Sequence, residues 1–171
     1  PILIEQIESV QLDPTKFNVG LTACDRPLAD YGNFDFARLC ERMDLLLLPS
    51  EWDQAMFRKS GVKTATAVIP LGFDYAEWEQ PIRNRQNTRV FILDRGRDYA
   101  EESNRIASKY FEVDYYRCSG IVGKKTREEL RRSYNYADIF IKWAEEGAWS
   151  YPVMEAMAAG CLVLTNCPYV M

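Results

Sequence analysis

Histidine is missing from this chain of 171 residues. Imidazole is the side chain that most often serves as a general base near neutral pH, and it is a common metal ligand. Mechanisms that need an imidazole base, and metal sites that need a histidine, are therefore excluded for this chain. The absence leaves carboxylates, basic side chains, hydroxyl groups and backbone amides to carry any chemistry.

Cysteine is scarce, and long apolar runs are missing. The five cysteines are odd in number and show no Cys-x-x-Cys spacing. Neither a disulfide framework nor a zinc site is therefore predicted, and free thiols fit a reducing cytoplasm. The longest aliphatic run, residues 45–48, is much shorter than a membrane span, and no charged-then-apolar signal segment opens the chain. We expect a cytoplasmic protein.

Neither sign of charge is in large excess. The chain has 21 Lys and Arg against 25 Asp and Glu, a net charge of −4, which excludes a general electrostatic attraction to nucleic acid. Hydrophobic residues make up 47% of the chain, as in globular proteins. A local basic cluster favours either peripheral contact with an anionic membrane or, as the simpler alternative, a solvated helix face. Its members are Lys124, Lys125, Arg127, Arg131 and Arg132.

Short apolar runs alternate with helical segments along the chain. Ser50, Thr126 and Pro152 mark the starts of three helices, because serine and threonine cap helices and proline fits the first turn. Strands that alternate with helices are typical of parallel sheets covered by helices, so the predicted fold class is α/β. The seven predicted strands are Val19–Cys24, Asp44–Pro49, Thr66–Pro70, Arg89–Asp94, Val113–Arg117, Ile139–Trp143 and Cys161–Thr165.

A polar stretch with one proline, residues 80–88, lacks apolar periodicity and is predicted to be a linker. It separates a first unit at 1–79 from a second at 89–171. Each unit has roughly 80 residues, which is small for a complete doubly wound domain.

The segment after the strand Ile139–Trp143 is the best candidate for a binding site. An acidic loop with one glycine leads into a helix that begins near Pro152 and carries Glu155, which we place in its first turn. Such loops lie at the carboxyl end of a strand, where open α/β sheets bind ligands. Amides at a helix start attract phosphate, and a carboxylate can accept hydrogen bonds from a ribose diol. Stabilisation of Glu155 by the helix dipole, without a ligand, is the alternative.

The segment 146–160, EGAWSYPVMEAMAAG, resembles the E-G…P…E-A-M-A-x-G signature of group 1 glycosyltransferases, the retaining family of the family-four type. Segments 44–62, 68–74 (VIPLGFD) and 128–141 are similar to other parts of that family, in the same order. The resemblance implies a GT-B-like fold of two Rossmann-like parallel-sheet units joined by a linker. Both units would be reduced in size, with the first, acceptor-side unit truncated.

The resemblance also implies residue roles. Glu155 would hold the ribose of the donor nucleotide, and Glu146, with Glu145 as a competing candidate, would lie beside the donor sugar. Arg97, which follows Gly96, would stabilise the leaving diphosphate, since a guanidinium can form paired hydrogen bonds with it.

Further residues complete this set. The backbone of the loop and helix start would face the diphosphate, and two cations are secondary candidates for its charge. The backbone positions are Gly147, Ser150, Val153 and Met154, the donor-side turn includes Gly96, and the two cations are Arg95 and Lys142. The family needs no metal for this step, and the chain has no Asp-x-Asp pair to hold one.

The expected activity is transfer of a sugar from a UDP- or GDP-linked donor to an acceptor hydroxyl, with retention of configuration and no other cofactor. The acceptor, a glycan, a lipid or another hydroxyl compound, stays open. The alternative is a non-catalytic nucleotide-sugar-binding or partner-binding remnant, such as one subunit of a two-chain transferase. Two departures from the family pattern favour this non-catalytic alternative. The loop between Glu146 and Glu155 is one residue longer than usual, and acidic residues stand where the family has a lysine after Arg97. Small sheets with open edges also favour self-association.

Overall fold

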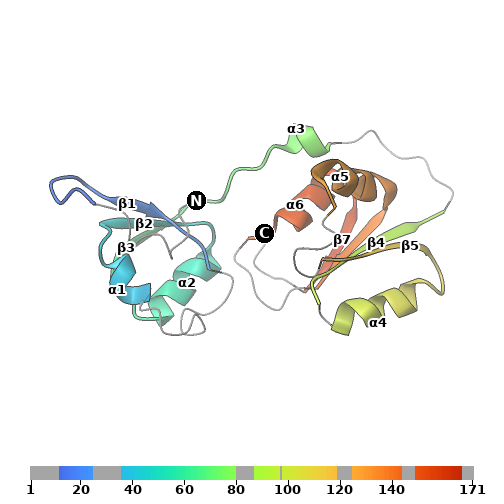
Figure 1. Cartoon of the computed structure of the whole chain (residues 1–171), viewed down its shortest axis with the longest axis horizontal. Coiled ribbons are helices and arrows are strands. Elements are labelled where there is room, and N and C mark those ends of the chain that lie inside the picture. The colour runs from blue at the N-terminus through green and yellow to red at the C-terminus, as the bar shows by residue number, and fades with distance from the viewer. Residues whose placement is uncertain are drawn as a thin grey trace. The chain divides into compact units, whose positions relative to one another are not determined.

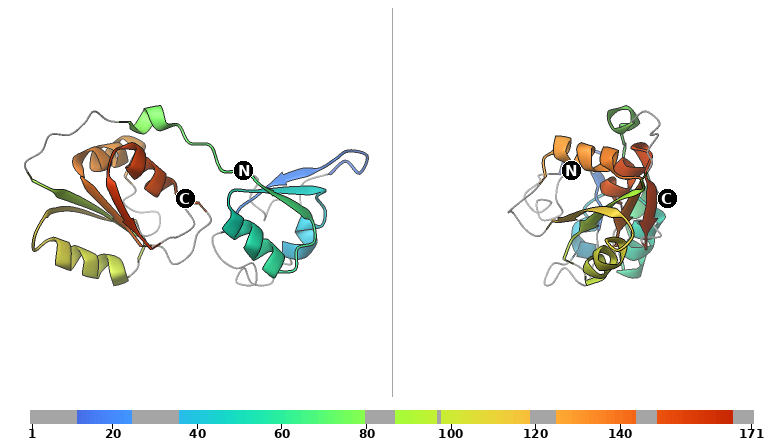
Figure 2. Two further views of the ribbon diagram at one scale, coloured as in Figure 1. Left: turned by 180° about the vertical axis from the view of Figure 1, so that it is seen from behind. Right: turned by 90° about the vertical axis from the view of Figure 1, so that its right-hand side faces the viewer.

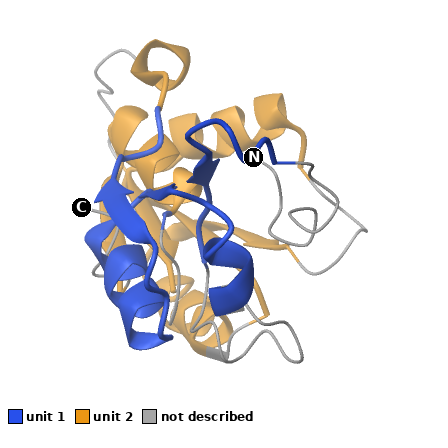
Figure 3. Ribbon diagram, turned by 90° about the vertical axis from the view of Figure 1, so that its left-hand side faces the viewer, with its two compact units in different colours: residues 1–72, 146–149, 171 blue, residues 73–145, 150–170 orange. Residues whose placement is uncertain are grey.

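The computed structural model describes residues 12–24, 36–79, 87–96, 98–118, 125–143 and 149–166 of the chain. Their contacts divide the chain into two compact units, with the division between Gly72 and Phe73 (Figures 1 and 3). Each unit has a parallel sheet and a hydrophobic core of its own, so the predicted α/β class is confirmed.

The first unit has a three-stranded parallel sheet in the order β1-β2-β3, with two helices on one face (Figure 2). Leu46 and Leu48 point to the helical face and are buried with Phe57 of the second helix. Val19 and Leu21 are about half exposed, at 49% and 46%. The elements are β1 (Val19–Leu21), α1 (Phe36–Cys40), β2 (Leu45–Leu48), α2 (Glu51–Lys59) and β3 (Ala65–Val68).

The second unit has a four-stranded parallel sheet in the order β5-β4-β6-β7. Helix α4 covers one face and helices α5 and α6 cover the other (Figure 1). The elements are α3 (Tyr75–Trp78), β4 (Arg89–Asp94), α4 (Asp98–Ala107), β5 (Glu112–Arg117), α5 (Arg127–Tyr136), β6 (Ile139–Lys142), α6 (Tyr151–Ala158) and β7 (Leu162–Thr165).

Strand β4 shows why this sheet is covered on both faces. Val90 and Ile92 are buried in a cluster with the alanines of α4, whereas Phe91 and Leu93 are buried in a cluster with α5 and α6. A strand that lies between two cores needs apolar residues at every position rather than at alternate ones. The continuous apolar run of the sequence is therefore explained by the central position of β4.

The predicted helix starts are confirmed where capping residues marked them. The Ser50 hydroxyl accepts a hydrogen bond from the Asp53 amide at the start of α2. Thr126 and Glu129 form the reciprocal bonds of a capping box at the start of α5. Side-chain caps satisfy amides that have no partner within the helix, so these residues define where each helix begins.

All seven predicted strands are present, but some bounds differ and three helices were not predicted. β1 ends at Leu21 because the Thr22 amide makes the last bond to β2, and the Cys24 amide bonds instead to the Asp53 carboxylate. Helices α1, α3 and α4 were not predicted. The buried face of α4 consists of Ala100 and Ala107, so its apolar stripe is weak in the sequence.

Residues 73–79, which the sequence analysis placed with the first unit, belong by their contacts to the second. Trp78 of α3 is 2% exposed and lies in the core cluster that contains Phe91, Tyr134 and Phe140. The burial of this one large side chain joins α3 to the second unit. Residues 80–86 of the predicted linker lie outside the described residues, so the linker stays a prediction.

Candidate functional site

The strand order of the second unit defines one switch point. From β4 the chain passes to β5 on one side and then returns to β6 on the other side. Leu93 pairs with Lys142, so the segments that follow β4 and β6 leave the same edge of the sheet from adjacent strands. Open α/β sheets bind ligands at such a point, outside the carboxyl ends of the strands.

Lys142 is the last residue of β6 and lies at this edge. Its side chain is only 5% exposed, and its Nζ donates a hydrogen bond of 2.6 Å to Oγ of Ser150, which is 4% exposed. A buried ammonium group is costly unless polar groups or an anion compensate it. Because the Ser150 oxygen accepts from Lys142, the hydroxyl proton can still be donated to a ligand. The predicted candidates Lys142 and Ser150 are thus brought together.

The start of α6 adds backbone donors. Ser150 is the N-cap residue, but its side chain makes no capping bond, and Pro152 has no amide hydrogen. The amides of Val153 and Met154 both donate to the Ser150 carbonyl, at 3.1 and 3.2 Å. In the described part of the chain, the amides of Ser150 and Tyr151 donate to no acceptor.

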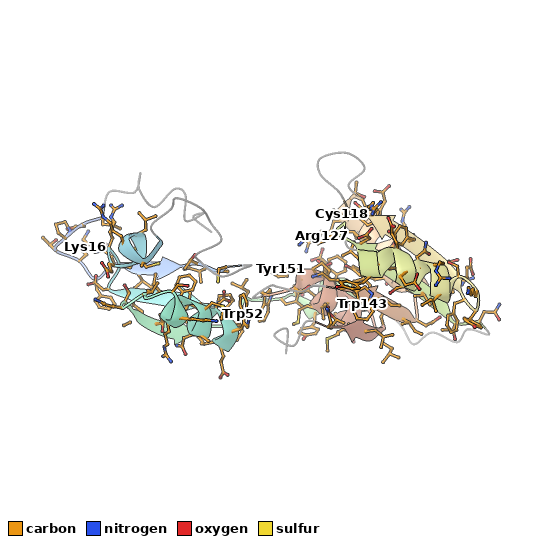
Figure 4. All side chains as sticks on the ribbon, turned by 90° about the horizontal axis from the view of Figure 1, so that it is seen from below. Lys16, Trp52, Cys118, Arg127, Trp143 and Tyr151 are labelled. Atoms are coloured by element: carbon orange, nitrogen blue, oxygen red, sulfur yellow. The ribbon has the colours of Figure 1, made fainter. Side chains whose placement is uncertain are left out.

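This pattern corrects one prediction. Val153 and Met154 were expected to offer their amides to a diphosphate, but both amides are used within the first turn. The described backbone donors that remain are Ser150, which was predicted, and Tyr151. Figure 4 labels Tyr151, the first residue of α6, and Trp143, which follows β6. Donors of hydrogen bonds and one cation therefore gather at the carboxyl end of β6, as an anion requires.

Glu155 is the fifth residue of α6, so it lies in the second turn. The sequence analysis placed it in the first turn, and that prediction was wrong. A helix dipole acts mainly within one turn of the helix end, so dipole stabilisation is a weaker explanation for this carboxylate. Oε2 accepts a hydrogen bond of 3.0 Å from the hydroxyl of Tyr134, which is fully buried. In the described residues no donor contacts Oε1, which leaves that oxygen able to accept from a ligand.

The environment of Glu155 favours its protonated form. Its side chain is partly buried, and this burial raises its pKa above the usual value for glutamate. The Tyr134 hydrogen bond and the positive charge of Arg127 act in the opposite direction, but they are smaller. Side chains at binding sites often have a pKa shifted in this way, because burial removes them from water and their neighbours compensate only in part.

The turn after β4 is held by Asp94, a residue that the sequence analysis did not single out. Its buried Oδ1 accepts a hydrogen bond of 2.7 Å from the Gly96 amide. Gly96 has a φ of 85°, which a residue with a side chain rarely adopts, and nothing lies within 4 Å of where a Cβ would be. Glycine is therefore required here by the backbone and not by lack of space. Arg95, one of the predicted cations, is exposed in the same turn.

Four predicted site residues lie outside the described residues, so their roles stay predictions: Arg97, Glu145, Glu146 and Gly147.

The sequence analysis missed the contact between Tyr134 and Glu155. The spacing of an aromatic residue on one helix gives no indication of which residue of the next helix it meets.

The described members of the basic cluster are all paired with carboxylates. Lys125 contacts Asp114 at 2.9 Å, Arg127 contacts Glu77, and Arg131 and Arg132 both contact Glu128. Pairing lowers the charge that this surface presents, so it favours the solvated helix face over membrane contact. No helix within the described residues has the length and apolar character needed to cross a membrane.

No protein-family model and no curated protein matches the sequence. Several solved structures resemble the fold, and two of them are described below. One, described as trehalose-6-phosphate from E. coli bound with UDP-2-fluoro glucose, has a TM-score of 0.59 and 13% identity, and the match covers 89% of this chain and 53% of that one. The other, trehalose-6-phosphate synthase OtsA, has a TM-score of 0.57 and 13% identity, with 89% and 52% covered.

These matches identify the fold. The chain has the GT-B-like α/β architecture that the motifs predicted, in a reduced form, and it spans about half the length of the solved structures that it matches. At 13% identity the likeness extends to the fold and not to the chemistry.

Proposed function

We propose that this chain is a glycosyltransferase that uses a nucleoside-diphosphate sugar and retains the configuration of the transferred sugar, as in the group 1, family-four type. The observation that carries the proposal is the cluster of donors at the carboxyl end of β6. Buried Lys142 contacts Ser150, and two amides at the start of α6 have no acceptor in the described residues. Cations, hydroxyls and helix-start amides are the groups that proteins use to bind phosphate.

Glu155 and the structural neighbours support the nucleotide-sugar part of the proposal. The carboxylate lies in the next turn of the same helix and has one oxygen able to accept from a diol. One neighbour was solved with a UDP-linked sugar. We therefore favour a ribose on Glu155 and a diphosphate at Lys142 and the α6 start, with UDP or GDP as the nucleotide.

The proposed reaction needs no protein base. The bond between the sugar carbon and the diphosphate oxygen breaks while a bond to the acceptor oxygen forms on the same face. The acceptor proton passes to the departing diphosphate oxygen. Lys142, the helix-start amides and the arginines after β4 would stabilise the charge that develops on the diphosphate. A chain without histidine is compatible with this route.

The test is a panel of UDP- and GDP-linked sugars, with binding measured by calorimetry and release of UDP or GDP measured with and without simple acceptors. Activity or binding should fall sharply in Glu155→Gln, which keeps an acceptor for Tyr134 but loses the charge. Glu41→Gln, an exposed carboxylate of the first unit, is the matched control. Binding without turnover would favour the non-catalytic alternative, and no binding to any donor would refute both.

A further inference from the structure

A buried carboxylate lies beside the proposed anion site, where simple electrostatics would disfavour it. Asp94 is the last residue of β4, and its side chain is 0% exposed. Oδ1 accepts from the Gly96 amide at 2.7 Å and Oδ2 accepts from the Tyr115 hydroxyl at 2.5 Å, while Nε of Arg117 forms an ion pair with Oδ2 at 2.9 Å. A buried carboxylate with such partners costs less than an unpaired one, but it is not needed to fill a core.

Arg117 forms ion pairs with this carboxylate and with a second one. It is the last residue of β5, directly opposite Asp94 in the ladder, and its Nη2 contacts Oε1 of Glu101 on α4 at 2.5 Å. The guanidinium is 47% exposed, so it connects the buried charge to the surface at the carboxyl edge. A diphosphate bound at this edge would therefore meet a carboxylate whose charge Arg117 partly offsets, and not a bare carboxylate.

The Oδ1 contact gives Asp94 a use that an apolar residue could not supply. It bonds to the amide of Gly96, whose left-handed backbone reverses the chain after β4. Arg95 and Gly96 form this turn, and Arg97 comes next in the sequence. The hydrogen bond thus fixes the turn that carries Arg95 at the switch point of the sheet.

We propose that Asp94 is a positioning residue for the donor diphosphate: it holds the turn after β4 so that Arg95 meets the anion, and Arg117 offsets its charge. This inference rests on the proposed use of a nucleotide sugar. It concerns the β4 turn, whereas the proposed function rests on β6 and α6.

The experiment compares binding of UDP with uridine, and of GDP with guanosine, by calorimetry. The variants are Asp94→Leu, which removes the acceptor for Gly96, and Asp94→Asn, which keeps one. Asp94→Leu should weaken diphosphate binding at least about fivefold, the size of one lost hydrogen bond, and leave the nucleoside almost unchanged. Asp94→Asn should recover most of that loss. Arg58→Met, an exposed cation of the first unit, is the control.

A second arm tests the charge and does not depend on the folding of Asp94→Leu. Arg117→Met leaves the carboxylate without its cation and should weaken UDP or GDP binding by about fivefold or more. Adding Asp94→Asn to that variant should restore affinity, since the uncompensated charge is gone.

The outcomes separate the two proposals. If wild-type protein binds UDP or GDP but the Asp94 and Arg117 variants bind equally well, the role of Asp94 is refuted and the proposed function stands. Equal losses for nucleotide and nucleoside would show general damage to the unit, and they also refute it. If wild-type protein binds neither nucleotide, both proposals fall.

Discussion

Replacing Lys142 with methionine tests the proposed anion site most directly. Methionine has a similar length and no charge, so the packing around this 5% exposed side chain is largely kept. The change removes the cation and its 2.6 Å contact with Ser150. The backbone bonds of β6 and of the start of α6 do not involve this side chain, so we expect both elements to form in the variant.

The magnitude follows from the burial of Lys142. A hydrogen bond to a charged group contributes roughly 1.5–3 kcal/mol, and screening by water is weak for a side chain so little exposed. Since about 1.4 kcal/mol corresponds to a tenfold change in affinity, Lys142→Met should weaken UDP or GDP binding roughly 10- to 150-fold. Uridine and guanosine carry no phosphate, so their binding should change little.

The assay is calorimetric titration of each nucleotide and its nucleoside, on protein whose fold is checked by circular dichroism. Lys59→Met is the matched control, because Lys59 is an exposed lysine at the end of α2 in the first unit. A folded Lys142→Met protein that binds the nucleotide within about twofold of wild type would refute the reasoning, since a buried cation at the diphosphate cannot be removed at no cost.

Three further predictions test the site in other ways. Gly96→Ala should lower the free energy of unfolding by about 1–2 kcal/mol in urea titrations, because alanine is strained at a φ of 85°; an unchanged midpoint would contradict the left-handed turn. Glu155 has a raised pKa, so its native form holds a proton more tightly than its unfolded form. Its ionisation therefore costs stability as pH rises above the usual pKa of a glutamate, and Glu155→Gln should gain stability relative to wild type between acidic and neutral pH. A stability difference that does not change with pH would refute this. Burial and the bond to Asp94 raise the pKa of Tyr115 to about 12, so the ultraviolet titration difference between wild type and Tyr115→Phe should have its midpoint near there and not near 10.

The seven strands could be predicted because each is an uninterrupted apolar run or a mixed run between turn residues, and caps such as Ser50 and Thr126 marked helix starts. Helix α4 could not, because alanines at positions 100 and 107 suffice to pack it on the sheet. A helix buried through small residues has almost no hydrophobic pattern, so its position becomes evident only from the sheet it covers.

The site was predictable as a set of residues but not as a set of contacts. The sequence analysis named Lys142 and Ser150 separately, and their 2.6 Å bond depends on where β6 ends relative to the start of α6. Asp94 was missed for a related reason. Its role depends on Arg117 and Tyr115, which reach it only through the register of β5 against β4. Contacts across strands are not encoded in local spacing.

A comparison of the two units supports the proposal of an anion site in the second. Helices α2 and α6 both begin after a serine N-cap at the carboxyl end of a parallel strand. In α2 the Ser50 hydroxyl caps the helix and donates to Asp53, and the first turn carries two carboxylates. Carboxylates in the first turn complement the helix dipole themselves and repel a further anion. In α6 the first turn has no acidic residue, and the Ser150 hydroxyl accepts a hydrogen bond from the buried Lys142. The same local architecture is therefore satisfied internally in the first unit, whereas in the second the amides of Ser150 and Tyr151 have no acceptor among the described residues, which supports the proposed anion there.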